Sequence, residues 1–371
     1  MKFIHCSDTH LGYSDYHKID PITGINQREQ DFYNAWNFLI EEILSKKPDF
    51  VVHAGDLFHT TRPTNRAIAV ALEGIQKVSD AGIPFILISG NHSTPKIRAT
   101  GSIFESISLF PNVFAAFQSK YQKFKIGECA IHCIPHCSLT EELQAAFEEI
   151  KPAKKVKYQI LVTHGSWAGK KSFSMGEFNE QKLPDLEMIS TIKFDYIALG
   201  HYHKFIEIKP NVIYSGSTER TSFNEAGNST GYVLFDLVQG KFDYHEIPSR
   251  PMFRLEPIDC RELNAAQIYE ELMQRSTDDL KDALVSLTMS NIQHQTLVKL
   301  DSREIDKIFD QVFYLNKSIS QLVSEGDGSS KSTDLGTVPM EFERYIENIT
   351  EKELDKERLK ALGLEYLVED M

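Results

Sequence analysis

The chain has 371 residues, of which 41% are hydrophobic and 25% are charged. This balance is typical of a globular protein and excludes wholesale disorder, and the length suits two or three domains. The sequence has no apolar run of about 18 residues and no secretory signal at its N-terminus, so we expect neither a membrane span nor export. Its five cysteines fit reduced thiols, and a cytoplasmic location is expected.

The formal net charge of -13 argues against nucleic-acid binding by bulk charge. However, the charge is unevenly distributed, because residues 1–250 carry 26 basic and 28 acidic side chains whereas residues 251–371 carry 14 and 25. The first part is therefore close to neutral, at -2, and the second is strongly acidic, at -11. The acidic part is better suited to a protein partner than to a nucleic acid.

Over residues 1–250, short apolar runs alternate with amphipathic helical patterns. The runs predicted to be strands are residues 3–6, 50–53, 85–89, 129–134, 159–163, 196–199, 212–214 and 232–237. Between the first three runs, apolar residues recur at helical spacing over 32–44 and 67–78. Continuous apolar strands separated by amphipathic helices predict an α/β sandwich covered on both faces.

From residue 251 the alternation becomes shorter and predicts a separate small α/β domain over 251–320. Residues 321–336, rich in Gly, Ser and Asp, predict a flexible linker. Beyond it, residues 337–371 carry two short amphipathic helical patterns, the first of which starts at Phe342. Helices this short cannot bury an apolar stripe alone, so they either bind a partner or fold back on their own domain.

Five polar clusters follow the apolar runs at the carboxyl ends of predicted strands. They are Asp8-Thr9-His10, Gly55-Asp56, Gly90-Asn91-His92, Thr163-His164-Gly165 and Gly200-His201-Tyr202-His203. In open α/β sheets these ends gather on one side, so residues far apart in the sequence converge. Two carboxylates, an Asn carbonyl and four imidazoles suit Mn, Fe or Zn in a catalytic site, with His92 left as a proton donor or charge stabiliser. Two such ions could hold a bridging hydroxide and stabilise a phosphoryl transition state.

The order of these motifs resembles that of the calcineurin-like metallophosphoesterases. Finer features resemble the nuclease subunit of the SbcCD-type DNA double-strand-break repair complex: His10-Leu11-Gly12-Tyr13, Gly55-Asp56-Leu57-Phe58-His59 and Tyr214-Ser215-Gly216-Ser217-Thr218-Glu219-Arg220. The resemblance implies a two-sheet metallophosphoesterase sandwich flanked by helices, a DNA-capping domain and C-terminal helices. It also implies exonuclease and endonuclease activity on DNA, a homodimer, and a coiled-coil ABC-type ATPase partner that docks on residues 337–371.

Carried over residue by residue, the resemblance implies two divalent metal ions, usually manganese. The ligands would be Asp8, His10, Asp56 and His203 for one ion, and Asp56, Asn91, His164 and His201 for the other. His92 matches the family's catalytic histidine, and His59 matches a second histidine near the scissile phosphate. Ser93 stands where the family commonly has Asp. A serine hydroxyl can orient the imidazole of His92 but supplies no charge, so we expect a weaker acid–base group unless another carboxylate substitutes.

Basic residues near the metal-binding loops and around the predicted strand at 159–163 are candidates for contacts with DNA phosphates. They are Arg62, Arg66, Lys96, Arg98, Lys154, Lys155 and Arg220. A run of charges is also typical of a plain solvated face. Cys129, Cys133 and Cys137 have a spacing that matches no common metal pattern. Cys129 and Cys133 share one face of the predicted strand but are about 13 Å apart, so we expect structural thiols and no metal site.

The sequence therefore predicts a Mn-dependent nuclease acting on DNA ends, duplex and single strands, in the cytoplasm and with the nucleoid during repair. Two alternatives remain open. A phosphodiesterase acting on a small nucleotide would use the same two-metal site. A slow, metal-binding DNA-end scaffold is suggested by Ser93.

Overall fold

The structure, a computed structural model, describes residues 1–95, 101–167, 181–184, 193–322, 346 and 358–360. Lys96 and Arg98 lie outside the described residues. Nearly all of the predicted linker (321–336) and of the predicted docking segment (337–371) also lies outside them. Among the helices of the described residues, none combines the length and apolarity needed to cross a membrane.

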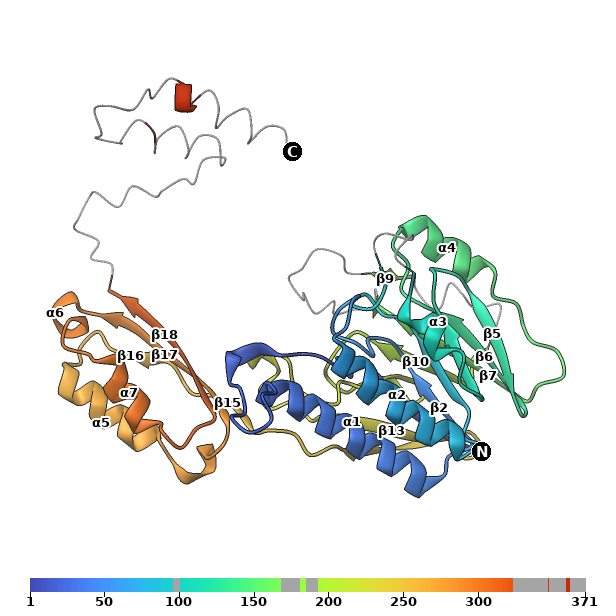
Figure 1. The fold of residues 1–371 in the computed structure, drawn as a ribbon, viewed down its shortest axis with the longest axis horizontal. Coiled ribbons are helices and arrows are strands. Elements are labelled where there is room, and N and C mark those ends of the chain that lie inside the picture. The colour runs from blue at the N-terminus through green and yellow to red at the C-terminus, as the bar shows by residue number, and fades with distance from the viewer. Residues whose placement is uncertain (96–100, 168–180, 185–192, 323–345, 347–357, 361–371) are drawn as a thin grey trace.

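Two six-stranded sheets lie face to face in the N-terminal part (Figure 1). The order of the first sheet is β14 (Lys241–Glu246), β13 (Gly231–Asp236), β1 (Lys2–Cys6), β2 (Phe50–His53), β3 (Phe85–Ile88) and β4 (Val113–Ala116). The order of the second is β11 (Ile206–Lys209), β12 (Val212–Tyr214), β10 (Tyr196–Gly200), β7 (Tyr158–His164), β6 (Cys129–Ile134) and β5 (Gln122–Ile126). The central strands of each sheet are parallel, so their carboxyl ends share one edge.

The three longest helices of the described part of the sandwich cover its outer faces (Figure 1). They are α1 (Gln27–Lys46) and α2 (Asn65–Asp80) on the first sheet and α4 (Thr140–Glu148) on the second. Asn26 and Thr64 precede α1 and α2, and their side-chain oxygens accept hydrogen bonds from backbone N–H groups of the first turn. These caps satisfy donors that a helix leaves free at its start.

Alternating apolar side chains build the layers of the sandwich. Ile4 and Val51 face α1 and α2, whereas Phe3 and Phe50 point between the sheets. The rings of Phe3 and Phe50 stack at 4.8 Å, and Phe3 meets Tyr196 of the second sheet edge-on at 5.0 Å. This aromatic contact fixes the two sheets against each other and therefore fixes the relative positions of their edges.

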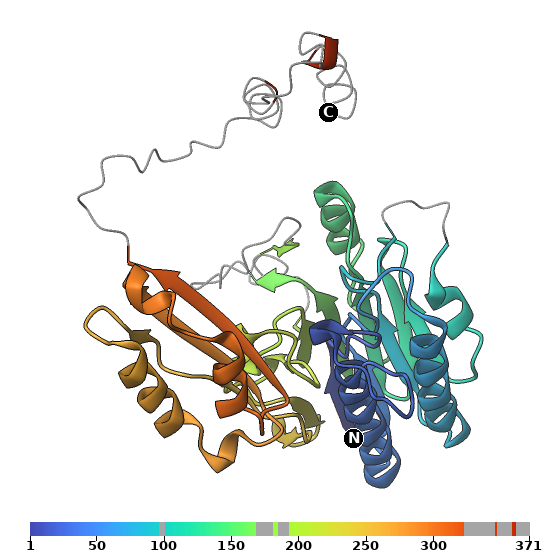
Figure 2. The same ribbon diagram turned by 60° about the vertical axis from the view of Figure 1, so that its left-hand side comes forward.

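Residues 252–321, which we call the C-terminal unit, form a third sheet of four parallel strands with its own apolar core (Figure 2). Its elements are β15 (Met252–Arg254), β16 (Ile258–Asp259), α5 (Ala265–Arg275), η4 (Asp278–Leu280), β17 (Leu284–Ile292), α6 (His294–Leu297), α7 (Ser302–Ile308) and β18 (Tyr314–Gln321). The short elements elsewhere are η1 (Asp15–His17), α3 (Ile103–Ile107), β8 (Ser166–Trp167), β9 (Lys182–Leu183) and η3 (Phe223–Glu225).

The C-terminal unit meets the sandwich at a junction around Arg250. The guanidinium of Arg250 donates two hydrogen bonds to the carboxylate of Asp31 in α1, at 2.7 and 2.8 Å. It also donates to the backbone carbonyl of Asp282 at 3.0 Å and lies 3.8 Å from the ring centroid of Phe313. Lys18 adds a 2.7 Å hydrogen bond to the carbonyl of Phe313. The two parts are thus joined by charge-assisted contacts.

The predicted α/β sandwich is confirmed, and each predicted strand is present. In the two large sheets, four further strands were not predicted: β4, β5, β11 and β14. All four lie at the edges of the two large sheets. The three thiols of β6 and the turn after it are free and buried.

Candidate metal centre

The polar clusters meet where the carboxyl ends of β1, β2, β3, β7 and β10 come together. Backbone hydrogen bonds of 3.0 Å join the first two loops, from Asp8 to Gly55 and from His10 to Asp56. The backbone N–H of His201, after β10, lies 3.2 and 3.1 Å from the two carboxylate oxygens of Asp8. The last contact joins the two sheets, so the candidate ligands from both converge on one place.

Four of the candidate ligands have a backbone in the left-handed region, which non-glycine residues rarely adopt. The φ angle is 52° at Asp8, 42° at His10, 53° at Asp56 and 107° at His201. Each such conformation costs about 1–3 kcal/mol and persists only where the surrounding structure fixes it. Strained backbone conformations are found mainly at functional sites, so their presence at four candidate ligands indicates that these residues belong to one.

Two glycines of the motifs leave the space that the ligands occupy. A Cβ on Gly90 would lie 2.2 Å from Oδ1 of Asp56, and a Cβ on Gly200 would lie 2.1 Å from the backbone oxygen of Ala54. Both distances are far shorter than any carbon–oxygen contact allows. Gly90 therefore lets two loops of the first sheet approach each other, and Gly200 does the same for loops of the two different sheets.

Asp8, His10 and His203 form one candidate ligand group, with their ligand atoms within 4.8 Å of one another. The Nε2 atoms of His10 and His203 are 3.0 Å apart. Nδ1 of His203 lies 2.9 Å from Oε1 of Glu225, which can only accept, so Nδ1 carries the hydrogen. In the neutral ring, Nε2 of His203 then turns its lone pair toward His10 and can bind a cation.

Asp56, Asn91 and His164 form the second group, with His201 beside it. Nδ1 of His164 donates to the backbone oxygen of Ala54 at 2.9 Å. Its Nε2 therefore turns a lone pair toward Oδ1 of Asn91, at 2.9 Å, and Oδ2 of Asp56, at 3.2 Å. Nδ1 of His201 is 3.4 Å from the same Asn91 oxygen. Acceptors that face one another need a cation or an added proton between them.

The protonation of the imidazoles shows that this place attracts positive charge. Burial opposes the charged form of His164, but the Asp56 carboxylate outweighs it and raises the pKa to about 9. Burial also opposes charging of His203, and the Glu225 carboxylate raises its pKa to about 9. Burial lowers the pKa of His201 to about 3, so that ring is neutral and able to bind a metal. The donor set thus fits divalent cations that take the place of protons.

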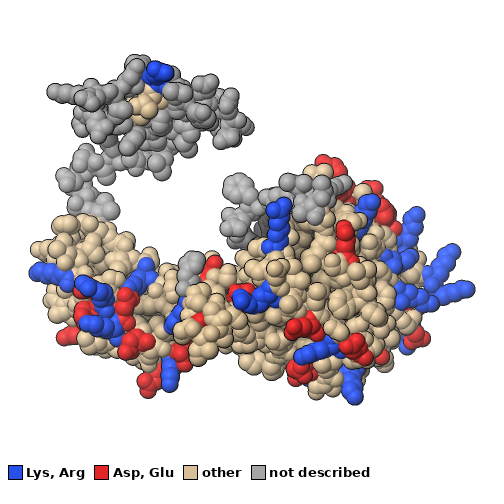
Figure 3. Space-filling view, in the orientation of Figure 1, with Lys and Arg blue, Asp and Glu red and all other residues tan. Residues whose placement is uncertain are grey.

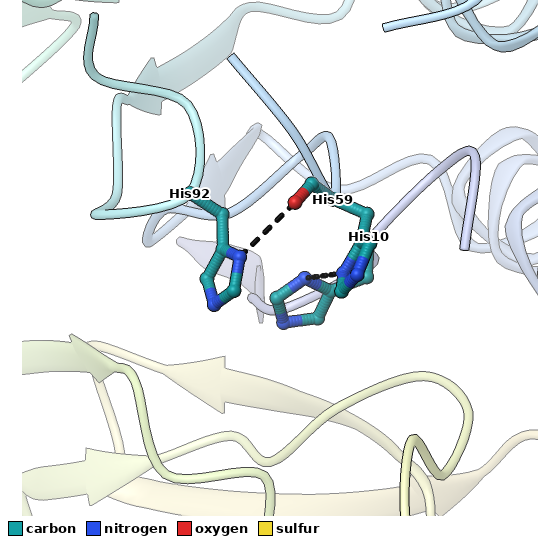
Figure 4. A group of neighbouring side chains, drawn as sticks. All are labelled: His10, His59 and His92. Atoms are coloured by element: carbon teal, nitrogen blue, oxygen red, sulfur yellow. Dashed lines mark hydrogen bonds between the residues drawn. The ribbon is translucent and has the colours of Figure 1, made fainter. Parts of the chain in front are cut away.

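His92 and His59 lie next to His10 (Figure 4). Nδ1 of the exposed His92 ring donates to the backbone carbonyl of His59 at 3.0 Å, and the backbone N–H of His92 donates to Oδ1 of Asp56 at 2.9 Å. Nε2 of His92 is therefore the ring nitrogen that remains available for proton transfer. The two rings stack at 5.2 Å, and burial followed by the proximity of His92 lowers the pKa of His59 to about 4.

Ser93 does not orient His92. Its side chain is buried, and its hydroxyl oxygen has no hydrogen-bond partner within the described part of the chain. The ring of His92 is instead held by the carbonyl of His59. The group that orients the imidazole of His92 is therefore a main-chain carbonyl, whereas the sequence led us to expect a side chain.

The candidate DNA contacts are scattered. Arg62 and Arg66 are exposed, and Arg66 lies 3.8 Å from Glu29. Lys154 and Lys155 precede β7, whereas His164 ends it, so they stand roughly 20 Å from the ligands. Figure 3 shows basic side chains gathered over the end of the molecule that carries β5 in Figure 1. Lys154 and Lys155 can therefore contact only DNA that extends beyond the candidate metal site.

Arg220 is held by the protein itself. Its nitrogens donate to the backbone oxygen of Asn228, at 2.8 and 2.6 Å, and to the hydroxyl of Ser249 at 2.9 Å. The side chain thus ties the loop after β12 to the segment that leads into the C-terminal unit. This arrangement favours a structural role over a phosphate contact.

Two residues at the site were not predicted from the sequence. Glu225 contacts His203, and the buried Tyr13 meets the ring of His59 edge-on at 5.0 Å. The Tyr13 hydroxyl also donates to the backbone carbonyl of Thr221. Tyr13 is the last residue of the motif His10-Leu11-Gly12-Tyr13. Glu225 lies in a polar loop with no pattern that distinguishes it from a solvated turn.

The sequence profile of the calcineurin-like phosphoesterases matches residues 1–205, which span β1 to β10 and every candidate metal ligand. The match covers more than half of the chain. The chain belongs to the calcineurin-like phosphoesterase family. Divalent metals serve this family, and the Asp and His groups described above could bind them.

Three curated relatives carry the name DNA double-strand break repair protein Mre11. The one from Methanococcus maripaludis is 29% identical over 94% of this chain and 96% of its own length. Those from Thermoplasma acidophilum and Methanocaldococcus jannaschii are 30% and 28% identical, over 82% and 73% of this chain and 81% and 70% of their own lengths. The resemblance to a phosphoesterase of break repair is therefore confirmed.

Proposed function

We propose that the protein is a nuclease of DNA double-strand break repair that hydrolyses phosphodiester bonds, as exonuclease and endonuclease, at two divalent metal ions. The observation that carries the proposal is the convergence of seven candidate ligands from both sheets on one strained site. The break-repair relatives, similar over most of their length, support DNA as the substrate.

Two divalent ions, manganese by preference, would be held by two ligand sets that have the Asp56 carboxylate in common. Asp8, His10 and His203 complete one set, and Asn91, His164 and His201 complete the other. When bound, the ions would activate water and stabilise the negative oxygens of the transition state. Outer contacts hold two of the histidine ligands, because Nδ1 of His164 donates to the Ala54 carbonyl and Nδ1 of His203 donates to Glu225.

His92 acts on the leaving or phosphate oxygen. With Nδ1 bound to the His59 carbonyl, the ring presents Nε2 in a fixed orientation for proton transfer. His59 is neutral near pH 7 and stacks on His92, which suits it to position the substrate without attracting the phosphate by charge. The hydrogen bond from His92 to the backbone carbonyl of His59 favours an active enzyme over the slow scaffold that Ser93 suggested.

The rest of the chain serves the choice of substrate and partner. Residues 251–320 act as a capping domain that selects DNA structure, residues 321–336 link it to the tail, and residues 337–371 dock a coiled-coil ABC-type ATPase. We further propose a cytoplasmic homodimer, associated with the nucleoid during repair, in which two sites face two DNA strands. The acidic charge of residues 251–371 suits a protein surface better than DNA.

The nuclease assignment is tested with linear duplex DNA and a small aryl phosphodiester, each with Mn²⁺. We expect DNA to be degraded, and His92→Ala to lower the rate roughly 10²- to 10⁴-fold while Mn²⁺ binding persists. His294→Ala, at an exposed histidine of the C-terminal unit, is the matched control and should be unchanged. Hydrolysis of the small ester with DNA intact in every metal would instead favour the small-nucleotide phosphodiesterase.

The docking assignment is tested by truncation after Gly336. We expect the truncated chain to lose co-purification with the coiled-coil ATPase while its own nuclease activity stays intact. An unchanged complex would refute docking through residues 337–371.

A further inference from the structure

Glu225 touches the proposed metal site from the side of the C-terminal unit. Its Oε1 lies 2.9 Å from Nδ1 of His203 and accepts from the hydroxyl of Thr221 at 2.6 Å, while its Oε2 accepts from the backbone N–H of Thr221 at 2.8 Å. The carboxylate is therefore fixed by three donors. Its side chain is only 12% exposed, so water competes little for the contact with His203.

Glu225 is also the last residue of η3, and the residues around it contact the C-terminal unit. Phe223 and Ala226 belong to one apolar cluster together with Tyr16, Met252, Leu284, Phe313 and Tyr314. Asn224 accepts a 2.8 Å hydrogen bond from Arg254 of β15. A segment of four residues thus contacts a candidate metal ligand with one side chain and the C-terminal unit with the others.

We propose that Glu225 is a positioning residue that holds His203 for metal binding, and that the C-terminal unit adjusts this hold through η3. The inference rests on the proposed function, because His203 is a proposed ligand. A carboxylate on the far nitrogen of a metal-binding histidine fixes its tautomer and raises its basicity. Because η3 is a single turn, a shift of the cluster around Phe223 must be passed to Glu225.

A purely structural role for Glu225 makes a different prediction. By binding Thr221 twice, the carboxylate also closes the loop 221–225, and the loss of that closure would lower the stability of the fold. It would not change the affinity of the folded site for metal. Metal affinity and the unfolding midpoint of the metal-free protein therefore separate the two roles.

The positioning role is tested by calorimetric titration of the metal-free full chain with Mn²⁺. We expect Glu225→Ala to weaken binding about 10- to 100-fold. Glu225→Gln keeps one acceptor for His203 but has no charge, so it should recover part of the loss. Glu207→Ala, at an exposed glutamate of β11, is the matched control. Wild-type affinity in Glu225→Ala would refute the positioning role, whereas a wild-type chain that binds no Mn²⁺ would refute the proposed function.

The adjustment by the C-terminal unit is tested with Tyr314→Ala. Tyr314 packs on Tyr16 at 4.6 Å and belongs to the apolar cluster that includes Phe223 and Ala226. We expect its removal to weaken Mn²⁺ binding about fivefold or more. Tyr269→Ala, at a half-buried tyrosine packed against the core of the C-terminal unit and outside the cluster around Phe223, should change the affinity by less than about twofold. Equal affinities for both variants would overturn the coupling.

Discussion

His164 and His203 hold protons in the metal-free protein where metal ions are proposed to bind. Asp56 and Glu225 raise the pKa of these rings to about 9 against the effect of burial. Because the folded pKa lies above the unfolded value of 6.5, the protonated rings stabilise the fold below pH 6.5. This stabilisation is lost as the pH rises to about 9. We expect the free energy of unfolding of the chelator-treated protein, measured in urea, to fall by on the order of a few kcal/mol between pH 6.5 and about pH 9.

Metal binding should show the opposite dependence on pH. The ions must displace these protons, so we expect the Mn²⁺ affinity to rise with pH by about tenfold per unit for each proton released. The measurement is calorimetric titration in buffers of different ionisation enthalpy between pH 6.5 and 8.5, which counts the protons released. An affinity that does not change with pH would contradict the assignment of His164 and His203 as ligands.

Ser93 is the position where the chain departs from the expected family motif. Because its buried hydroxyl has no partner in the described residues, it costs stability and orients nothing. We expect Ser93→Ala to leave DNA cleavage unchanged and to leave the free energy of unfolding unchanged or raise it by up to about 1 kcal/mol. A rate loss as large as that of His92→Ala would mean that the hydroxyl takes part in the reaction.

The loop after β10 shows how the two sheets create the site between them. A Cβ at Gly200 would lie 2.1 Å from the carbonyl of Ala54 and 2.9 Å from Nδ1 of His164. We expect Gly200→Ala to separate β2 from β10 and to lower the free energy of unfolding by about 1–3 kcal/mol, with a larger loss of Mn²⁺ affinity than of stability. Gly240→Ala is the control, because its Cβ meets nothing within 4 Å and only the backbone strain at φ 63° remains.

The strands of the two large sheets that the sequence did not reveal are the outermost ones. β5 and β14 alternate exposed polar side chains with half-buried ones, so they lack the continuous apolar run that marks the central strands. β11 is mostly exposed, whereas β4 is as short and apolar as β2 and β3 and was missed without such a reason. Edge strands pair on one side only, so their sequences are less constrained by burial.

The candidate ligands were predictable because each follows a buried parallel strand, and such strands bring their carboxyl ends together. Three features of the site were not. Glu225 comes from a loop without a periodic pattern, and the hold on His92 is a backbone carbonyl that any residue at position 59 could supply. The third is Arg220, whose side chain binds the protein's own backbone, a role that its motif did not indicate.

The charge of the whole molecule is divided in a way that suits its proposed task. The near-neutral residues 1–250 carry the site, and two divalent ions would bring them from -2 to about +2 where a phosphodiester must lie. The acidic charge belongs to residues 251–371, which include none of the candidate ligands. Electrostatic attraction of DNA therefore depends on the bound metal more than on surface lysines.

The connection between the two parts of the molecule depends on Arg250. Asp31, the Asp282 carbonyl and the ring of Phe313 all contact its guanidinium, and such charged hydrogen bonds are worth about 2 kcal/mol. We expect Arg250→Ala to loosen the junction without unfolding either core. Amide hydrogen exchange in β15 and η3 should then become roughly 30-fold faster.

Lysine at this position should restore little of the protection, because it cannot form the paired contact with Asp31 or stack on Phe313. Arg303→Ala, at an exposed arginine of the C-terminal unit, provides the control and should leave exchange at the junction unchanged. If Arg250→Ala exchanged at the wild-type rate, the apolar cluster around Tyr16 and Phe223 would have to hold the junction alone. The coupling between the C-terminal unit and His203 would then depend on packing and not on charge.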